Sequence, residues 1–339
     1  MRLTQLGERG LIRLIRASLG TVDPAVTVGI GDDCAILSPT PGTRLLATTD
    51  LLIEGIHFRR RYAEPADIGW KALARNLSDI AAMGGTPRFA LVALACPPET
   101  EVEEIEALYA GIRAAAAPHA VSIVGGDTSA SPQGLIVNVT LLGEAAGRPC
   151  LRSGAIPGDL LAVTGSLGLS AAGLALLEAP PAPDLPPEVV GEVSRAHLRP
   201  LARVAEGIFL GHADGVHAMI DCSDGLVTDL GHLVTESGVG ARVRLDQLPI
   251  PPAVGRVARL TRRDPLEFAT TGGEDYELLL SLAPAAFPEL VSGLKRATGT
   301  ELTVIGEILA SEAGVRFLDA QGQPVALAEG FEHFSPGGR

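Results

Sequence analysis

Hydrophobic and polar positions alternate along the chain with two periods, one typical of helices and one typical of strands. The first twenty residues interleave Arg and Glu with Leu and Ile at helical spacing, which predicts an amphipathic helix. Residues 65–83 predict a second helix, because Pro65 suits a first turn and Gly84-Gly85 ends the pattern. Short apolar runs between such segments predict buried strands. The alternation predicts an α/β protein of α+β type.

Two stretches of the chain follow this plan. The first predicts strands within 26–37, 44–58 and 88–97, a helix over 99–117, and two strands around a polar turn within 120–145. The second predicts strands at 160–165, 217–220, 241–245, within 270–282 and at 301–309, with helices over 167–179, around 200–211 and along Leu226, Leu230 and Leu233. The prolines of 179–188 predict an irregular loop.

The length of the chain predicts more than one domain. A chain of 339 residues is too long for one ordinary hydrophobic core. The pattern of strands and helices restarts near residue 150, after a Gly- and Pro-rich crossing. We therefore expect an N-terminal domain over 1–148 and a C-terminal domain over 149–339.

Composition and charge narrow the possible classes of function. No apolar run approaches the roughly 18 residues of a membrane span, and the charged N-terminus is unlike a secretion signal, so we expect a cytoplasmic protein with no membrane partner. The net charge of −13 argues against a nucleic-acid partner, since such proteins display basic surfaces. The four cysteines are scattered without a CxxC pair, which predicts reduced, structural thiols.

Acidic residues recur in six places, in most cases where an apolar run ends. The six are Gly31-Asp32-Asp33, Thr48-Thr49-Asp50, Asp79, Gly125-Gly126-Asp127, Asp221-Cys222-Ser223-Asp224 and Gly272-Gly273-Glu274-Asp275. Any one of them could be an ordinary turn or helix cap. The six together favour a common site.

Asp79 is the most informative of these acids. At 100° per residue it lies on one side of its helix with Asn76 and Met83, beside an apolar stripe, so its carboxylate should be partly buried. A buried charge needs a partner. The partner is either an arginine, such as Arg75 or Arg88, or a metal cation.

Oxygen ligands select hard cations, and Mg²⁺ suits a site that also holds substrate phosphates. Two like charges 4 Å apart repel by about 4 kcal/mol at an effective dielectric near 20, so a polyphosphate cannot approach bare carboxylates. Mg²⁺ between them converts repulsion into attraction. The acidic clusters therefore predict an enzyme that acts on a Mg-nucleotide.

The common nucleotide motifs are missing from the sequence. There is no GxxxxGK[ST], and Lys71 and Lys295 are the only lysines, which excludes a P-loop and a protein-kinase arrangement. GIGDD does not match GxGxxG, so the dinucleotide fingerprint is absent as well. Direct phosphoryl transfer remains favoured, because it requires mainly positioning and charge neutralisation.

Nine segments, in this order, resemble the thiamine-monophosphate kinase family: GIGDDCAIL, TTDLLIEGIHF, DIGWKALARNLSDIAAMGGTP, GGDTS, RSGAIPGD, VTGSLGLSAAGL, MIDCSDGLVTDL, GGEDYELLL and GFEHF. The family is grouped with aminoimidazole-ribonucleotide synthetase and selenophosphate synthetase. The resemblance implies ATP-dependent phosphorylation of thiamine monophosphate to thiamine diphosphate, the last step of that cofactor's biosynthesis, by a homodimer with several Mg²⁺ ions per site. It also implies a two-domain synthetase-like fold, in which an N-terminal mixed sheet binds ATP and Mg²⁺ and pairs across the dimer, and a C-terminal α/β sandwich completes the site.

The resemblance also implies roles for individual residues. The metal-ligand positions are Asp32, Thr48, Thr49, Asp50, Asp79, Asp127, Asp221 and Asp224. The nucleotide contacts are Tyr109, Gly126, Asp127, Arg152 and Ser223, and the thiamine-phosphate contacts are His57, Glu274 and Phe331.

No covalent nucleophile is implied, because the attacking atom is an oxygen of the substrate's own phosphate. The resemblance implies that Asp50, Asp79 and Asp127 assist the transfer through metal ions, and Arg152 would add a permanent cation suited to phosphate. Cys222 is a poor candidate nucleophile, since the neighbouring carboxylates should raise its pKa.

Two other interpretations remain open at this point. Aminoimidazole-ribonucleotide synthetase shares the use of metal and ATP but activates an amide oxygen. A non-catalytic Mg-nucleotide-binding protein could keep the same fold. Selenophosphate synthetase is disfavoured because the first thirty residues hold neither Cys nor Lys, and a hydrogenase-maturation relative because the chain ends in PGGR rather than a reactive cysteine.

Overall fold

The computed structural model describes residues 1–19, 23–179, 185–328 and 330. The chain divides into two compact units. The N-terminal unit comprises Met1–Ile80 and Gly85–Arg148, and the C-terminal unit comprises Ala81–Gly84 and the chain from Pro149 onward. In the part of the chain that the structure describes, no helix has the length and apolar character needed to cross a membrane.

The N-terminal unit is built on a four-stranded mixed sheet in the order β3-β6-β4-β5. Its strands are β3 (Thr43–Ile53), β4 (Thr86–Cys96), β5 (Ser122–Ala130) and β6 (Ile136–Ala146). β4 and β5 run parallel, and the other pairs are antiparallel. The remaining elements are α1 (Leu3–Leu6), α2 (Glu8–Ser18), β1 (Val26–Val28), β2 (Ile36–Leu37), α3 (Pro65–Ala82), α4 (Val102–Ala116) and the short helix η1 (Ala117–His119).

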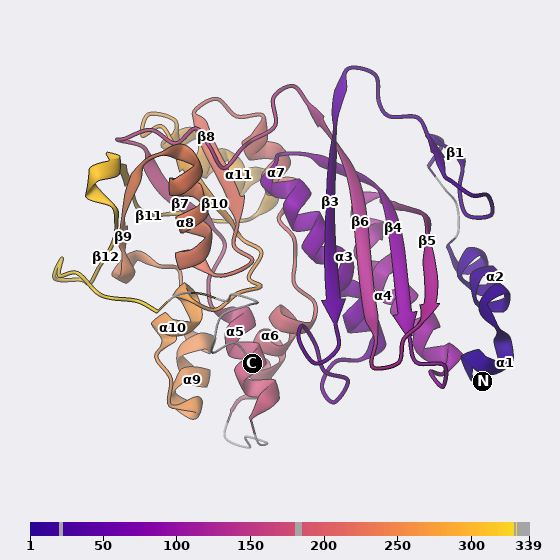
Figure 1. The fold of residues 1–339 in the computed structure, drawn as a ribbon. Coiled ribbons are helices and arrows are strands. Elements are labelled where there is room, and N and C mark those ends of the chain that lie inside the picture. The colour runs from indigo at the N-terminus through magenta and orange to yellow at the C-terminus, as the bar shows by residue number, and fades with distance from the viewer. Residues whose placement is uncertain (20–22, 180–184, 329, 331–339) are drawn as a thin grey trace. The chain divides into compact units, whose positions relative to one another are not determined.

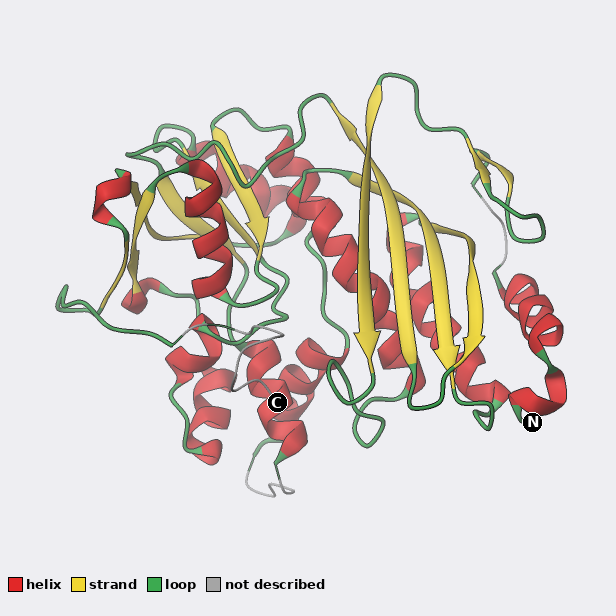
Figure 2. Cartoon of the chain, in the orientation of Figure 1, coloured by secondary structure: helices red, strands yellow, loops and turns green. Residues whose placement is uncertain are grey.

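Helices α3 and α4 cover one face of this sheet (Figures 1 and 2). Val137, Val139 and Leu141 of β6 are fully buried and alternate with half-buried residues, as expected for a strand with one covered face. The two helices touch backbone to backbone at glycines. A Cβ atom at Gly111 would lie 1.9 Å from the carbonyl oxygen of Ala66, so the close crossing requires glycine.

The C-terminal unit has a six-stranded sheet in the order β12-β9-β11-β7-β10-β8, in which only the β12–β9 pair is parallel among the described strands. The strands are β7 (Leu160–Thr164), β8 (Val216–Asp221), β9 (Gly240–Arg244), β10 (Leu278–Leu282), β11 (Leu302–Leu309) and β12 (Val315–Leu318). The helices are α5 (Leu169–Glu178), α6 (Pro187–Leu198), α7 (Val204–Gly211), α8 (Leu226–Ser237), α9 (Pro252–Thr261), α10 (Pro265–Thr270) and α11 (Phe287–Thr298), with the short η2 (Leu245–Gln247) and η3 (Ser311–Ala313).

Hydrophobic clusters of buried side chains hold the described part of the C-terminal unit together. One lies between the sheet and α8, where Leu226, Leu230 and Leu233 are buried, as their spacing predicted. Another lies among α5, α6, α9 and α10. Helices α7 and α11 lie on the opposite side of the sheet from α8 (Figure 1). The mixed α/β fold class predicted from the sequence is confirmed.

Several local predictions need correction. The single N-terminal helix is in fact α1 and α2, because Gly7 at φ +72° interrupts it. Part of 179–188 lies outside the described residues, but Pro187 begins α6, since proline is tolerated in the first turn of a helix. The sequence pattern also missed α6, α9, α10, α11 and β12.

Candidate functional site

A cleft of about 880 Å³ lies in the N-terminal unit, over the end of the sheet at β5. Its lining includes Asp32, Asp33, Tyr109, Gly126 and Asp127. Four of the predicted site residues therefore lie around one cleft. Asp32 comes from the GIGDD loop, Tyr109 from α4, and Gly126 and Asp127 from the GGD segment of β5. Burial raises the pKa of Tyr109, which keeps its hydroxyl protonated.

Gly126 allows this cleft to form. Its φ is +153°, and a Cβ atom there would lie 1.8 Å from the carbonyl oxygen of Val92 on the neighbouring strand. Only glycine permits so close an approach of β5 to β4. Asp127 follows at once and is exposed to the cleft, inside β5 rather than beyond its end as the sequence pattern suggested.

Two polar groups beside the acids stand out. The buried hydroxyl oxygen of Thr128, next to Asp127, has no hydrogen-bond partner in the described structure. The guanidinium of Arg16 on α2 lies against Gly31, with Nη1 2.5 Å from where a Cβ atom would stand. Neither residue was predicted from the sequence, although Thr128 lies within the GGDTS segment.

The acids of β3 and α3 form a second group in the N-terminal unit. The hydroxyl of Thr48 donates to Asp79 Oδ2, and Arg75 Nη2 lies 3.4 Å from Asp50 Oδ1. Asp79 is half-buried, as predicted. Asp50 lies inside β3, whereas most of the acidic clusters were expected where an apolar run ends.

Arg88, one of the two arginines considered for Asp79, pairs with Asp23 and Glu144 instead. Thr49 points to the other face of the sheet, since side chains alternate along a strand. Its hydroxyl lies 3.0 Å from that of Thr140, which lines the cleft. The structure therefore brings Thr49 toward the cleft and Thr48, Asp50 and Asp79 together on the helix-covered side.

His57 follows β3 in a tight turn. Its amide N–H donates to the carbonyl of Ile53 at 3.0 Å, and the amide N–H of Ile53 donates to its ring Nδ1, also at 3.0 Å. The turn thus fixes both the backbone and the ring of a residue that the sequence singled out as a substrate contact.

The donor atoms of these groups fit a hard cation. The side chains are carboxylates and hydroxyls, with no thiolate or imidazole among the proposed ligands, and such donors suit Mg²⁺. Within the described ranges, no group of three or more His, Cys, Asp or Glu side chains is arranged to hold a metal ion. The buried Thr128 hydroxyl beside Asp127, which has no hydrogen-bond partner among the described residues, is a further oxygen atom next to this carboxylate.

In the C-terminal unit, two neighbouring segments carry most of the other predicted site residues. β8 ends at Asp221, and the loop after it carries Ser223 and Asp224; backbone hydrogen bonds join this loop to the GGEDYE segment before β10. The amide N–H of Glu274 donates to the carbonyl of Ser223 at 2.8 Å. Glu274 has φ +66°, a left-handed conformation that ordinary residues seldom adopt and that is often found at functional sites.

The acids of these two segments have different hydrogen-bond partners. Asp275 accepts hydrogen bonds from the amide N–H groups of Gly168 and Ser170, 2.6 and 3.1 Å away, at the start of α5. Glu277 is bound by Arg203, whose Nε and Nη2 each lie 2.7 Å from it. The sequence placed Asp275 in one of the acidic clusters but predicted neither its partners nor those of Glu277, since such partners are known only from the tertiary fold.

The carboxylates also affect one another's ionisation. Burial, together with Asp221 and Asp224, raises the pKa of Asp229 to about 8. Burial first and neighbouring carboxylates second raise the pKa of Cys222 well above its usual value. The expected direction for Cys222 is therefore supported, and its thiol is a poor nucleophile.

The surroundings of Arg152, Glu274 and Phe331 differ from one another. Arg152 is exposed, and its carbonyl accepts from the hydroxyl of Ser237 at 2.9 Å. Glu274 Oε2 lies 3.4 Å from His197 Nδ1. Phe331 lies outside the described residues, but Gly330 before it lies against Thr228 and the carbonyl of Asp224.

Comparison with known proteins bears on the whole chain. The family model described as AIR synthase related protein, N-terminal domain, matches residues 31–145, and that of the C-terminal domain matches 157–319. The thiamine-monophosphate kinase of Salmonella typhimurium is 39% identical over 317 residues, which cover 91% of this chain and 93% of that protein.

Solved structures of thiamine-monophosphate kinases are also similar to this chain. The crystal structure of thiamine-monophosphate kinase from Stenotrophomonas maltophilia has a TM-score of 0.81 at 36% identity, covering 93% of this chain and 96% of that one. A structure described as AaThiL complexed with AMPPCP and TMP has a TM-score of 0.75 at 36% identity, covering 98% of this chain and 99% of that one. The chain is thus similar to this group of proteins along nearly its full length.

Replacing Asp275 by Asn should flatten the pH dependence of stability between about pH 4 and pH 7. Burial raises the pKa of Asp275 from 3.8 to about 7, so in this window the folded chain keeps a proton that the unfolded chain has released. Stability therefore falls as the pH rises, by up to about 1.4 kcal/mol per pH unit from this one group. Urea denaturation of both proteins at pH 5, 6 and 7 measures the two slopes, and equal slopes would contradict the assignment.

Proposed function

The chain belongs to the AIR synthase related proteins and, within them, to the thiamine-monophosphate kinases, and from this premise we propose how its residues carry out the reaction. It catalyses the ATP-dependent phosphorylation of thiamine monophosphate to thiamine diphosphate. The observation that carries the assignment is the likeness, over 98% of the chain, to a structure complexed with AMPPCP and TMP, an ATP analogue and the phosphate acceptor.

The nucleotide is proposed to bind in the cleft of the N-terminal unit. Tyr109, Gly126 and Asp127 line this cleft, which supports their role. Arg152 and Ser223 of the C-terminal unit are the other proposed nucleotide contacts. Thiamine monophosphate is proposed to contact His57, Glu274 and Phe331.

Mg²⁺ is proposed as the metal, held by the oxygen ligands Asp32, Thr48, Thr49, Asp50, Asp79, Asp127, Asp221 and Asp224. When bound, it neutralises phosphate charge and polarises phosphoryl oxygens. Support comes from the chemistry of the donors and from the solvent-exposed position of Asp32 and Asp127 in the cleft.

The chain's own part in the transfer is positioning. The acceptor is a phosphate oxygen that is already ionised at neutral pH, so no side chain has to remove a proton from it. The reaction is proposed to be a direct in-line displacement, in which the γ-phosphoryl group of ATP passes to the substrate phosphate without a phosphorylated side chain. The buried thiol of Cys222, with its raised pKa, gives no competing nucleophile.

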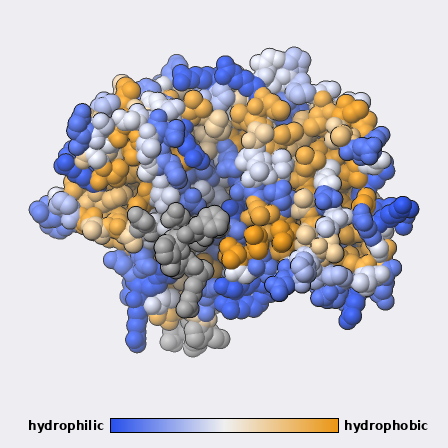
Figure 3. Space-filling model, in the orientation of Figure 1, coloured by the Kyte–Doolittle hydropathy of each residue, from blue (hydrophilic) through white to orange (hydrophobic). Residues whose placement is uncertain are grey.

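The N-terminal unit is also proposed to form a homodimer through the sheet face opposite α3 and α4. Hydrophobic side chains gather over this face (Figure 3), and Leu45 and Leu51 of β3 are 55% and 44% exposed. Exposed apolar groups on a sheet face favour burial against a partner. Residues 1–148 would then serve nucleotide binding and dimerisation, and residues 149–339 would complete the site, in a cytoplasmic enzyme.

A substrate panel tests the reaction. With ATP and Mg²⁺, the purified protein should convert thiamine monophosphate to the diphosphate and leave free thiamine unchanged, because the attacking group is a phosphate oxygen. Mass spectrometry identifies the phosphorylated product. ATP consumption with formylglycinamidine ribonucleotide, and none with thiamine monophosphate, would move the assignment to the synthetase.

Asp127→Asn tests the metal role. The exposed carboxylate contributes little to folding, so the variant should keep the thermal stability of the wild type while turnover falls by about 100-fold or more, as when a key electrostatic contact is lost. Calorimetric titration with Mn²⁺ in the presence of a non-hydrolysable nucleotide should show weaker metal binding. Asp246→Asn, an exposed acid of η2, serves as the control. Unchanged metal affinity in Asp127→Asn would refute the ligand role.

Leu51→Asp tests the dimer. A charge at this exposed position should oppose burial of the sheet face and release monomers of 35.0 kDa, which sedimentation velocity resolves from dimers. Leu260→Asp alters a similarly exposed leucine on α9 and should leave the dimer intact. A wild-type protein that sediments as a monomer at micromolar concentration would rule out the proposed interface.

A further inference from the structure

The segment from Glu54 to Glu64 connects β3 to α3 and carries His57; we refer to it as the His57 loop. The amide N–H of Gly55 donates to the carbonyl of Phe58 at 2.8 Å, which closes a tight turn around His57. Because the N–H of Ile53 donates to the ring Nδ1, that nitrogen carries a lone pair, and the neutral ring carries its proton on Nε2. The hydrogen bond at Nδ1 thus fixes which nitrogen of the neutral ring carries the proton.

Arg60 ties this loop to two other elements. Its Nη1 lies 2.7 Å from Glu104 Oε2 on α4, and its Nε lies 3.2 Å from Glu54 Oε2. The same Glu54 oxygen accepts from the amide N–H of Leu135, at 2.8 Å, just before β6. One arginine therefore connects the His57 loop to α4 and to the start of β6; we call this set of contacts the Arg60 strut.

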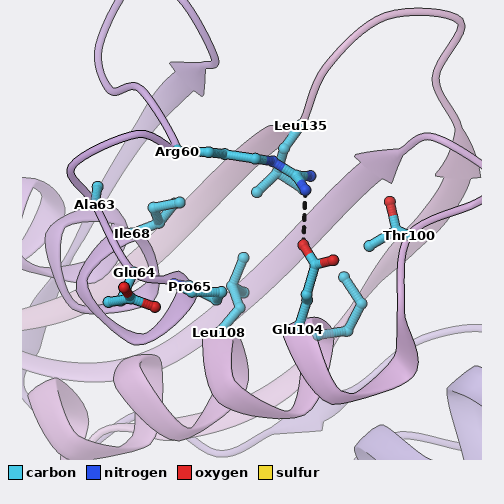
Figure 4. A pocket seen from close by; sticks show the side chains of 10 residues that line it. Arg60, Ala63, Glu64, Pro65, Ile68, Thr100, Glu104, Leu108 and Leu135 are labelled. Atoms are coloured by element: carbon cyan, nitrogen blue, oxygen red, sulfur yellow. Dashed lines mark hydrogen bonds and ion pairs between the residues drawn. The ribbon is translucent and has the colours of Figure 1, made fainter. Parts of the chain in front are cut away.

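The Arg60 side chain lines a pocket between the His57 loop and α4. Figure 4 shows Arg60 extending over the pocket toward Glu104, with Ile68 and Leu108 among its apolar walls. The pocket has a volume of about 240 Å³. Phe58 and Ala63 anchor the loop by burial on either side of Arg60. Between these anchors the ion pairs of Arg60 join the loop to α4 and to the segment before β6, and so contribute to its position.

The ion pairs of the Arg60 strut contribute little to the free energy of folding. The side chains of Arg60 and Glu104 are each 35% exposed, and solvent screens such pairs, so they add little to the free energy of folding. The guanidinium, however, is planar and can bind two carboxylates in fixed directions, which a lysine cannot do. A contact of this kind contributes geometry more than energy.

We propose that Arg60 is a positioning residue for thiamine monophosphate, because its strut holds the His57 loop so that the Nε2–H of His57 meets the substrate. The inference rests on the proposed function, in which His57 contacts this substrate. Arg60 itself does not touch the reacting atoms. Its effect on the reaction passes through His57.

The test compares Arg60→Ala and Arg60→Lys in the wild-type and His57→Ala backgrounds. In the wild-type background, Arg60→Ala should raise the KM for thiamine monophosphate roughly tenfold, less than the hundredfold cost of misplacing reacting groups, and leave the KM for ATP and the Tm unchanged. Arg60→Lys should recover part of the loss. In the His57→Ala background, Arg60→Ala should add less than about twofold, since residues that act as a unit are not additive.

A spectroscopic measurement complements the kinetics. Nitrogen-15 NMR of the imidazole rings should show His57 as the Nε2–H tautomer in the wild type and a mixture of tautomers in Arg60→Ala. Arg244→Ala removes an exposed arginine that pairs with Asp246 in the C-terminal unit, and it should change neither KM.

Three outcomes would overturn the inference. Equal rises in both KM values, or a lower Tm that accounts for the loss, would make the strut merely structural. Additive effects of Arg60→Ala and His57→Ala would show that Arg60 acts independently of His57. An unchanged His57 tautomer with an unchanged KM would remove the positioning role. If the wild type fails to phosphorylate thiamine monophosphate, the proposed function fails, and the NMR comparison still decides whether Arg60 orients His57.

Discussion

Repulsion between carboxylates is the constraint on which the polar parts of both units depend. Acids that shape the loops receive partners from the chain: Asp275 binds two backbone N–H groups at the start of α5, and Glu277 binds Arg203. Asp127 lies exposed in the cleft instead, beside the Thr128 hydroxyl, which has no partner in the described structure. The fold therefore satisfies these structural acids internally and leaves Asp127 exposed, where we propose that a cation arriving with the nucleotide binds.

Backbone conformation separates neighbouring acids that the sequence alone cannot tell apart. In GGEDYE, Glu274 and Tyr276 adopt positive φ values of +66° and +52°, so successive side chains turn in different directions. Glu274 lies near His197, Asp275 binds the start of α5, and Glu277 points to Arg203. Three acids within four positions thus take three surroundings. The strained backbone gives each one a separate place.

Periodicity and punctuating residues predicted much of the fold. The helix over 65–83 is α3, ending one residue early, and the half-buried state of Asp79 followed from the angle of that position on the helix. Contacts between distant residues could not be predicted this way. Arg203 and Glu277 are 74 positions apart, and Arg60 and Glu104 are 44 apart, so only the tertiary fold brings them together. The position of Asp50 in the middle of β3 could not be predicted, because an acid within an apolar run resembles the polar residue that follows a strand.

The scarcity of lysine is a further reason to propose metal ions for this chemistry. Of the 27 basic residues only two are lysines. Lys71 is 3% exposed on α3, and Lys295 on α11 pairs with Glu301, so neither presents a flexible ammonium group to the cleft. Two anionic substrates must nevertheless meet in a chain of net charge −13. Because lysines do not offset the several kcal/mol of repulsion between these anions, we propose that arginines and divalent cations supply the neutralising charge and that the exposed acids of the cleft hold the cations.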